Sequence, residues 1–299
     1  MITKEAIQGW FKGLQQNICT ELEAADGTGK FITDTWQRPG GGGGITRVLT
    51  GGSVIEKGGV NFSAVFGKAP EAILQSLRIT DHPDFLATGV SIVLHPHSPM
   101  VPIIHMNVRY FELSNGTYWF GGGIDLTPHY VVEEDARYFH QRLKTVCDQH
   151  NPSYYPEFKK WADEYFFIRH RHETRGIGGI FFDNLKEEGD VTKTDRFKFV
   201  QDVGITFAPT YIHLMDKNKA LPFGEREKQW QLLRRGRYAE FNLVWDRGTK
   251  FGLKTDGRTE SILMSLPPQA NWLYNFQPDP ESAEAKTLRL LKKGIDWVS

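Results

Sequence analysis

Three strand-like segments in the middle of the sequence constrain the fold more than any other feature. They cover residues 90–95, 105–113 and 117–127, and only short connections separate them. Two parallel strands need a crossover connection of about a dozen residues or more, and these gaps are too short to hold one. The three segments therefore predict an antiparallel meander, in which each strand pairs with the next.

The rest of the chain alternates further strand patterns with apolar residues at helical spacing. Strands are predicted at 60–67, 178–184, 237–246 and 251–255, and helices near 3–24, 131–149, 154–172, 193–215, 223–235 and 281–292. No internal repeat, low-complexity linker or break in composition divides the chain, so we expect one domain over residues 1–299. The predicted fold class is α+β, with helices covering a large, mostly antiparallel sheet.

A run of glycines from Gly40 to Gly44 interrupts this pattern. Glycine lacks a side chain and leaves the backbone free to take conformations that other residues avoid. The run predicts either a mobile loop near a ligand or a flexible connector, and both interpretations fit the sequence equally well.

Composition excludes several classes of function. The chain has 36 basic and 36 acidic residues and no block of one charge, so nothing supports a nucleic-acid partner or a membrane surface. Its two cysteines, Cys19 and Cys147, are far apart in the sequence, which favours reduced thiols over a disulfide framework. The sequence shows neither a secretory leader nor a run of about 20 apolar residues. We therefore expect a cytoplasmic protein.

The second strand of the meander carries a polar row. Because successive side chains on a strand point to opposite faces, His105, Asn107 and Arg109 share one face. Ser91 and His95 share a face of the first strand in the same way. The turn-rich connection between the two strands predicts that they pair directly, which would make the two histidines neighbours.

The strand predicted at 237–246 has a second polar row, with Tyr238, Glu240, Asn242 and Asp246 alternating with apolar residues. One interpretation is that both rows simply face water, as half-exposed antiparallel sheets commonly do. The other is a cleft. Solvated strands tend to carry Lys, Glu and Thr, whereas these rows hold residue types that fix a ligand through directional hydrogen bonds, which favours the cleft.

Arginine is frequent near these segments. Its planar guanidinium binds a carboxylate through two parallel hydrogen bonds, so a substrate with several carboxylates would use several arginines. The alternative for most of these arginines is an ordinary ion pair at the protein surface, with no contact to a substrate. The candidates are Arg109, Arg175, Arg234, Arg235, Arg237, Arg247 and Arg258.

Motifs for several common chemistries are missing from the sequence. It contains no phosphate-binding GxxxxGK[ST] loop, no dinucleotide-binding GxGxxG and no GxSxG nucleophile elbow. A metal site has only weak support, because no HExxH motif, cysteine pair or compact His and carboxylate triad accompanies the histidines. The candidate metal ligands are His95, His97, His105, His140 and His170.

Eight longer blocks occur in order along nearly the whole chain. They are WQRPGGGGGITRVL (36–49), GGVNFS (58–63), GVSIVLHPHSPMVP (89–102), HMNVRYF (105–111), WFGGGIDLTP (119–128), RGIGGIFFDNL (175–185), RRGRYAEFNLVWDRGTKFGL (234–253) and GRTESILMSLPP (257–268). Together they resemble the oxygen-dependent coproporphyrinogen III oxidase family, and no departure within them removes a key residue.

The resemblance implies an enzyme of haem biosynthesis. It would use molecular oxygen to convert two propionate side chains of coproporphyrinogen III into vinyl groups, giving protoporphyrinogen IX, carbon dioxide and hydrogen peroxide. The resemblance implies no organic cofactor such as flavin, nicotinamide or haem. It also implies a homodimer and a flat antiparallel sheet of about seven strands between helices, with a dimer-forming strand segment near 238–273.

The resemblance also implies roles for single residues. The family's proton donor corresponds to His105, and an Asp-Arg pair implicated in activity corresponds to Asp246 and Arg247. Bacterial members are described with four histidines that bind a divalent metal, whereas other members look metal-independent. The four histidines would be His95, His105, His140 and His170. The substrate contacts would be Ser91, Asn107, Val108, Arg109, Arg175, Asp256, Gly257 and Arg258.

Asp246 is the candidate for the central chemical step. A porphyrinogen is a flexible, largely apolar macrocycle with pyrrole N–H groups at its centre and carboxylates at its rim. A buried carboxylate would accept hydrogen bonds from those N–H groups and help to remove one proton, making the ring electron-rich enough to react with oxygen. Two alternatives are a non-catalytic tetrapyrrole carrier and a non-haem metal oxygenase built on the histidines.

Overall fold

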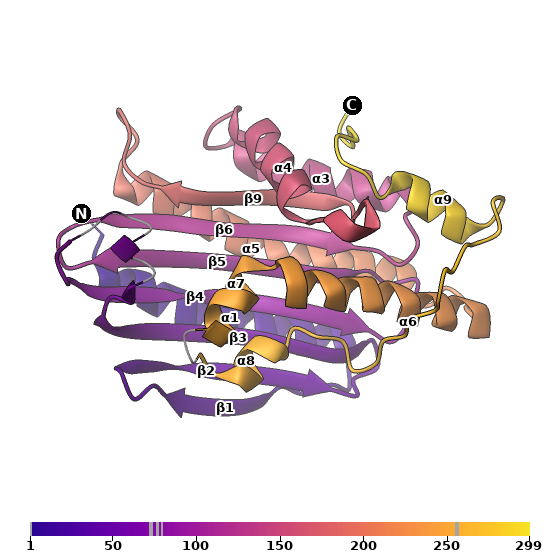
Figure 1. Ribbon diagram of the computed structural model, residues 1–299, viewed down its shortest axis with the longest axis horizontal. Helices are drawn as coiled ribbons and strands as arrows, with labels where there is room; N and C mark the ends of the chain where they lie inside the picture. Colours follow the sequence, from indigo (N-terminus) through magenta and orange to yellow (C-terminus); the bar gives the residue numbers. More distant parts are fainter. Residues whose placement is uncertain (1, 72–73, 76–77, 79, 255–256) are drawn as a thin grey trace.

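A computed structural model describes residues 2–71, 74–75, 78, 80–254 and 257–299. Its main sheet has seven antiparallel strands in the order β1-β2-β3-β4-β5-β6-β9 (Figure 1). The strands are β1 (Ile32–Gln37), β2 (Gly42–Thr50), β3 (Ile55–Lys68), β4 (Asp84–Pro96), β5 (Ile103–Leu113), β6 (Tyr118–Thr127) and β9 (Gly178–Leu185). The meander and the α+β class predicted from the sequence are both confirmed.

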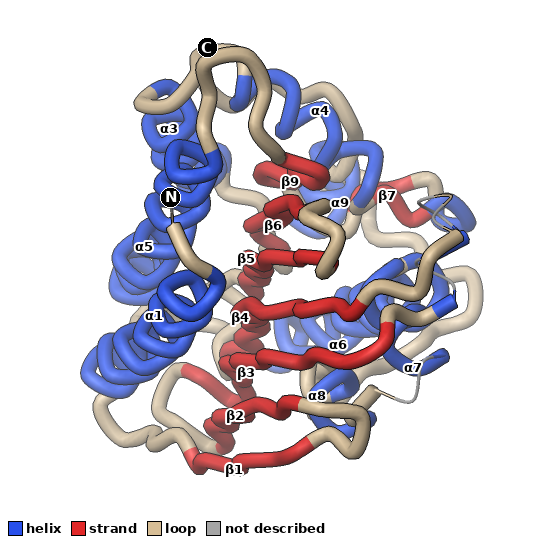
Figure 2. The backbone as a smooth tube through the Cα atoms, turned by 90° about the vertical axis from the view of Figure 1, so that its left-hand side faces the viewer, coloured by secondary structure: helices blue, strands red, loops and turns tan. Residues whose placement is uncertain are grey.

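Helices cover both faces of this sheet. In Figure 2 the sheet is seen edge-on, with α1, α3 and α5 on one side and α6, α7 and α8 on the other. Helix α4 packs along the edge strand β9. The helices are α1 (Lys4–Asp26), α3 (Glu133–Asp148), α4 (Tyr154–Tyr165), α5 (Lys193–Asn218), α6 (Glu225–Glu240), α7 (Arg247–Lys254), α8 (Thr259–Leu263) and α9 (Ala283–Leu290).

The main core lies between the sheet and helices α1 and α5. Met106 and Val108 of β5 are fully buried there, in one cluster with Phe11 of α1 and Phe197 of α5. Burying a large apolar side chain stabilises the fold by roughly 1.5–3 kcal/mol, so burial of this face of the sheet contributes strongly to stability. The polar row of β5 is left to the opposite face.

Two predicted strands are wrong. Residues 237–246 continue α6 into a short π-helix, Phe241–Trp245, and residues 251–254 belong to α7. Buried residues recur here every three or four positions, as at Arg234, Tyr238 and Phe241, so the segment follows the helical period. For the same reason, the strand that the resemblance placed near 238–273 is helical over much of its length.

The helix predicted over 154–172 is too long. It ends at Tyr165, and the chain then forms strand β7 (Phe167–Ile168), a 3₁₀ turn (Arg169–Arg171) and strand β8 (Glu173–Thr174). His172 has a φ of 56°, a left-handed conformation that an α-helix does not contain. This tight reversal returns the chain toward β9.

The glycine run does not form a loop along its whole length. Gly42 to Gly44 begin β2, and a turn at 38–41 joins this strand to β1. Gly42 has a φ of 79°, and a Cβ atom there would overlap the carbonyl oxygen of Ala64 on β3. The glycine is therefore needed for close pairing at the start of β2, rather than for mobility.

Candidate active site

Met106 and Val108 of β5 pack with residues of α1 and α5, so the polar row between them lies on the opposite face of the sheet. Helices α6, α7 and α8 cover that opposite face (Figure 2). His105, Asn107 and Arg109 are partly buried, whereas Met106 and Val108 between them are fully buried on the other face. Burial thus alternates in step with the side chains of the strand. The row is the side of β5 that a ligand can reach, and Val108 presents only its backbone to it.

The neighbouring strands carry no side chains beside part of this row. Gly89 of β4 and Gly121 of β6 flank Arg109, and Gly123 of β6 lies opposite Asn107. Neighbouring groups fill the space beside these glycines: a Cβ atom at Gly121 would meet Asp183 and Arg109, and one at Gly123 would meet Phe181. The glycines therefore make room for side chains of the row and of β9.

A buried ion pair between Asp125 and Arg175 holds His105. The Nδ1 atom of His105 lies 2.8 Å from Oδ1 of Asp125, the residue opposite His105 on β6. Asp125 also accepts two hydrogen bonds from Nη2 of Arg175, at 2.7 and 2.9 Å. Burial acts to raise the pKa of Asp125, but the charge of Arg175 and the His105 contact outweigh it and keep this pKa lowered. Because an ionised carboxylate only accepts, Nδ1 of His105 donates and Nε2 is left for chemistry.

Arg175 joins the sheet to the π-helix. Its Nη1 atom donates to Oδ1 of Asn242 at 2.9 Å, and its guanidinium lies 4.4, 4.7 and 4.6 Å from the ring centroids of Phe166, Tyr238 and Phe241. The residue is only 3% exposed. Its direct contact with a substrate stays a prediction, and the geometry favours a role in positioning other groups.

Asp246 directly follows the π-helix, and two donors fix its carboxylate. The hydroxyl of Tyr165 donates to Oδ1 at 2.8 Å, and the backbone N–H of Thr249 donates to Oδ2 at 2.6 Å. Burial and the nearby charge of Asp246 raise the pKa of Tyr165, so this hydroxyl keeps its proton. Phe166, next along the chain, packs edge-on against the ring of His105. Asp246 and His105 thus flank the same aromatic pair.

Arg247, the other half of the predicted Asp-Arg pair, is exposed. Its guanidinium lies 5.6 Å from the ring centroid of Tyr165. No carboxylate in the described part of the chain forms an ion pair with it. Arg247 is therefore placed beside Asp246 with its N–H groups available to a ligand.

Arg258 already interacts with other side chains of the protein. It directly precedes α8 and donates to Asp34 of β1 and, at 3.0 Å, to Ser261. Gly257 donates its backbone N–H to the carbonyl of Gly252. Asp256, the third predicted contact in this segment, lies outside the described residues.

The segment around α8 covers the sheet beside Ser91. Asn61, which pairs with Ser91 across β3 and β4, donates to the carbonyl oxygen of Ser261 at 2.9 Å. The Met264 side chain fills the space above Gly59, where a Cβ atom would collide with it. The predicted Ser91 contact therefore lies at the border between the covered and uncovered parts of the face.

Comparison with known proteins decides the family. The sequence model of the family described as Coproporphyrinogen III oxidase matches residues 6–297. The chain belongs to the coproporphyrinogen III oxidase family. A relative from Drosophila melanogaster, named oxygen-dependent coproporphyrinogen-III oxidase, is 51% identical over 298 residues, which cover 95% of this chain and 76% of the relative. Among the described residues, no helix has the length and apolar character that a membrane crossing requires.

The four histidines that correspond to metal ligands in bacterial members of the family do not converge here. Both ring nitrogens of His140 and of His170 have hydrogen-bond partners, and Nε2 of His95 lies 2.9 Å from a backbone carbonyl. Burial lowers the pKa of His95 and of His140 to about 3. No group of three or more His, Cys, Asp or Glu side chains among the described residues is arranged to hold a metal ion. This arrangement does not fit a metal site built from one chain.

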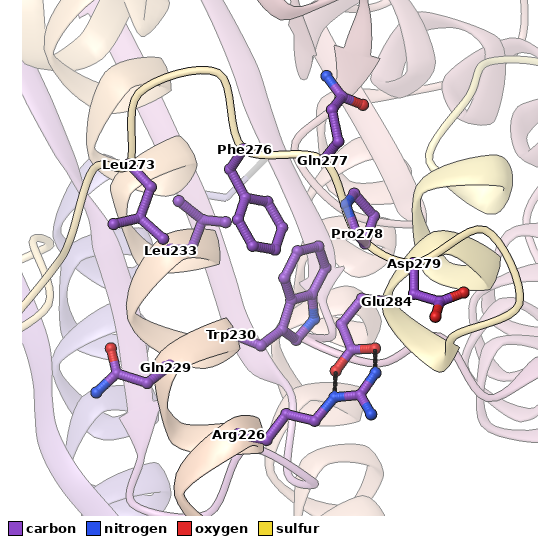
Figure 3. Close-up of a pocket in the computed structure, with 10 residues that line it drawn as sticks. All are labelled: Arg226, Gln229, Trp230, Leu233, Leu273, Phe276, Gln277, Pro278, Asp279 and Glu284. Atoms are coloured by element: carbon purple, nitrogen blue, oxygen red, sulfur yellow. Dashed lines mark hydrogen bonds and ion pairs between the residues drawn. The ribbon is translucent and has the colours of Figure 1, made fainter.

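A cavity of about 270 Å³ lies away from this face, between α6 and the segment that precedes α9 (Figure 3). Trp230, Leu233 and Phe276 form apolar walls. Arg226, the one cation among its described lining residues, is paired with Glu284 at 2.7 Å. The cavity therefore offers no free cation to a ligand with several carboxylates, and the sheet face is the better site for a member of this family.

Sequence reasoning missed three polar residues of this site. Asp125 and Asp183 are acidic residues on otherwise largely apolar strands, and the alternation rule places Asp125 on the same face as Gly121 and Gly123 of the GGGID run. That pattern was the available signal for them. Tyr165 had none, because it contacts Asp246 only after folding, across 81 residues of sequence.

Proposed function

We propose that the polar sheet face is where this enzyme carries out the oxygen-dependent oxidative decarboxylation of coproporphyrinogen III in haem biosynthesis. Each of two propionate side chains loses carbon dioxide and two electrons to become a vinyl group, and oxygen is reduced to hydrogen peroxide. One observation carries the proposal: two donors fix the Asp246 carboxylate, and the aromatic pair Tyr165 and Phe166 connects it to His105 in the polar row of β5. Arg109 lies in the same row, and Arg247 follows Asp246 at the start of α7.

The residues of the face match the parts of the substrate. Arginine at the rim suits the propionate carboxylates, because a guanidinium donates two parallel hydrogen bonds to one carboxylate. Arg109 and Arg247 take this role in our proposal, with Ser91 and Asn107 as further polar contacts. The macrocycle lies against the polar row, and the aromatic pair Tyr165 and Phe166, which contacts Asp246 and His105, supplies an apolar wall.

Asp246 takes the first chemical step. Its carboxylate accepts hydrogen bonds from the pyrrole N–H groups and removes one proton, which leaves the ring electron-rich and able to react with oxygen. Tyr165 and Thr249 hold the carboxylate in one orientation, so no reorganisation is needed as charge develops on the ring. The substrate supplies the electrons itself, in keeping with an enzyme that needs no organic cofactor.

His105 takes the second role. The peroxide formed on the ring accepts a proton from the β-carbon of the propionate and departs. Carbon dioxide then leaves as the vinyl group forms, and the proton held by Asp246 returns to the pyrrole nitrogen. The departing hydroperoxide needs one further proton, which we assign to Nε2 of His105. Asp125 holds the opposite side of the imidazole at 2.8 Å and fixes the orientation of the ring.

An oxygen-uptake assay with coproporphyrinogen III tests this function. We expect two molecules of oxygen to be consumed, and two of carbon dioxide released, for each protoporphyrinogen IX formed. Asp246→Asn serves as the matched variant, because it keeps the shape of the side chain without its charge. Binding without oxygen uptake would indicate a carrier. Uptake that requires metal and places oxygen in the product would indicate a metal oxygenase.

We further propose that residues 1–299 form one domain, that the protein is cytoplasmic and that it works as a homodimer. The two free, buried cysteines support a reducing compartment. Exposed apolar side chains near the end of α6 and before α9 support a self-association surface in the region that the resemblance indicated. They are Leu243, Val244, Trp272, Leu273 and Tyr274. Sedimentation of the native protein and of the Leu243→Asp variant distinguishes a dimer from a monomer.

A further inference from the structure

Asp183 of β9 is an acidic residue at the edge of the site with no assigned role. Its Oδ2 atom lies 3.0 Å from Nη2 of Arg109, whose Nη1 donates to Oδ1 of Asn107 at 2.8 Å. The other carboxylate oxygen, Oδ1, is buried and has no hydrogen-bond partner in the part of the chain that the structure describes. Asn107, Arg109 and Asp183 thus form a continuous polar chain from β5 to β9.

An irregularity in the sheet aims Asp183 at this chain. Where β6 pairs with β9, the single residue Gly121 faces two residues, Asp183 and Asn184. Asn184 has a φ of 54°, in the left-handed region that few non-glycine residues adopt. A β-bulge of this kind redirects side chains and is common beside active sites.

Gly121 provides the space in which the ion pair meets. A Cβ atom at this position would overlap Oδ1 of Asp183 and would lie 2.9 Å from Nη2 and 3.0 Å from Nε of Arg109. Any other residue would therefore push the two side chains apart. Because the crowded atoms are the ends of flexible side chains, the fold itself tolerates a small substituent here.

We propose that Asp183 is a positioning residue that sets substrate affinity by holding Arg109 in one orientation before the substrate binds. The proposal rests on the proposed function of Arg109 as a contact for a substrate carboxylate. An arginine that is already oriented loses less conformational freedom on binding. A guanidinium has five N–H groups, and Asn107 and Asp183 use only part of that set. The remaining N–H groups are presented to a propionate.

Asp183→Ala tests the proposal by separating binding from turnover. We expect KM to rise by roughly tenfold while kcat changes little, because Asp183 does not touch the reacting atoms. The dissociation constant of coproporphyrinogen III, measured without oxygen so that no turnover occurs, should rise by the same factor. Asp84→Ala is the matched control, since Asp84 is an exposed acid of β4 that pairs with Lys68 at 2.9 Å.

A double-mutant cycle shows whether Asp183 acts through Arg109. Arg109→Ala should raise KM at least as much as Asp183→Ala does. Adding Asp183→Ala to Arg109→Ala should then produce no further change, because no guanidinium remains to be held. A further rise in KM in the double variant would mean that Asp183 acts in another way and would overturn the proposal.

Gly121→Ala reaches the same ion pair by a different route. The added methyl group displaces the two side chains without removing either, so KM should again rise with little change in kcat. Gly13→Ala in α1 is the control, because a Cβ atom there meets nothing within 4 Å.

The outcomes separate this proposal from the proposed function. If Arg109→Ala raises KM and Asp183→Ala does not, the positioning role is wrong and the function stands. If neither variant changes KM, Arg109 is not a substrate contact, and both the role of Arg109 and the positioning role are wrong. A fall in kcat together with a lower melting temperature in Asp183→Ala would indicate a purely structural residue and would also overturn the proposal.

Discussion

Strand β5 and residues 237–246 have similar alternating sequences but fold differently. In β5, burial alternates with sequence position, and one face forms core while the other faces the site. In residues 237–246 the buried positions include Tyr238 and Asn242, one helical turn apart. Two-residue alternation is therefore not enough to predict a strand, because the positions that packing buries decide which period the segment follows.

The two regions also contribute different residues to the proposed site. Strand β5 supplies His105, Asn107 and Arg109, and the chain after the π-helix supplies Asp246. Arg175 connects them, since one guanidinium binds Asp125 on the sheet and Asn242 on the π-helix. A π-helical turn often lies at a functional site, and here it directly precedes Asp246.

Removing the Asp246 carboxylate, which follows the helical region, should have the largest effect on turnover. We expect Asp246→Ala to lower kcat by roughly 10²–10⁴-fold, the range typical of a lost general base, with little loss of folding stability. Oxygen uptake and thermal unfolding measure the two quantities. Asp216→Ala, at an exposed acid of α5 that pairs with Lys219, is the control. Near-normal turnover would remove Asp246 from the mechanism.

Breaking the connection between the two regions should mainly lower stability. Arg175→Met leaves Asp125 buried without its cation, so we expect the free energy of unfolding to fall by about 3–5 kcal/mol in urea denaturation. Adding Asp125→Leu removes the unpaired charge and should restore part of that loss. A fully stable Arg175→Met variant would show that Asp125 finds another partner.

The stability of the helical region should also depend on pH. Burial acts to raise the pKa of Glu240, but Arg171, His170 and Trp272 outweigh it and lower this pKa from 4.5 to about 2. A depressed carboxyl pKa stabilises the folded state above the unfolded value, and this stability is lost as pH falls through the folded value. Glu240→Gln should therefore be less stable than the native protein at pH 7. The difference should shrink below pH 4.5 and vanish near pH 2.

Chelation of divalent metal ions should have the smallest effect on oxygen uptake. Of the candidate ligands, His105 lies on β5 and His170 contacts the helical region. Both ring nitrogens of His170 are occupied, one by Glu240 and the other by Trp245. We expect exhaustive chelation to leave oxygen uptake unchanged. A loss of activity that a divalent ion restores would instead assign these histidines to a metal.

Much of the fold was predictable because its signals are local. Short gaps between apolar strands predicted the meander at residues 90–127, and helical spacing located α3 and α5 to within a few residues. Family resemblance supplied the proposed roles of His105 and Asp246. It did not indicate how either side chain is held, because Asp125 and Arg175 are 50 residues apart and Tyr165 and Asp246 are 81 residues apart.

By itself the sequence determined the α+β class, the antiparallel meander and the face on which His105, Asn107 and Arg109 lie, because two-residue periodicity on a strand is fixed by backbone geometry. The tertiary structure alone decided that residues 237–245 are helical and that Arg175 is buried. It also brought Arg109 and Asp183 together over Gly121. These features depend on packing between distant segments, which no local pattern encodes.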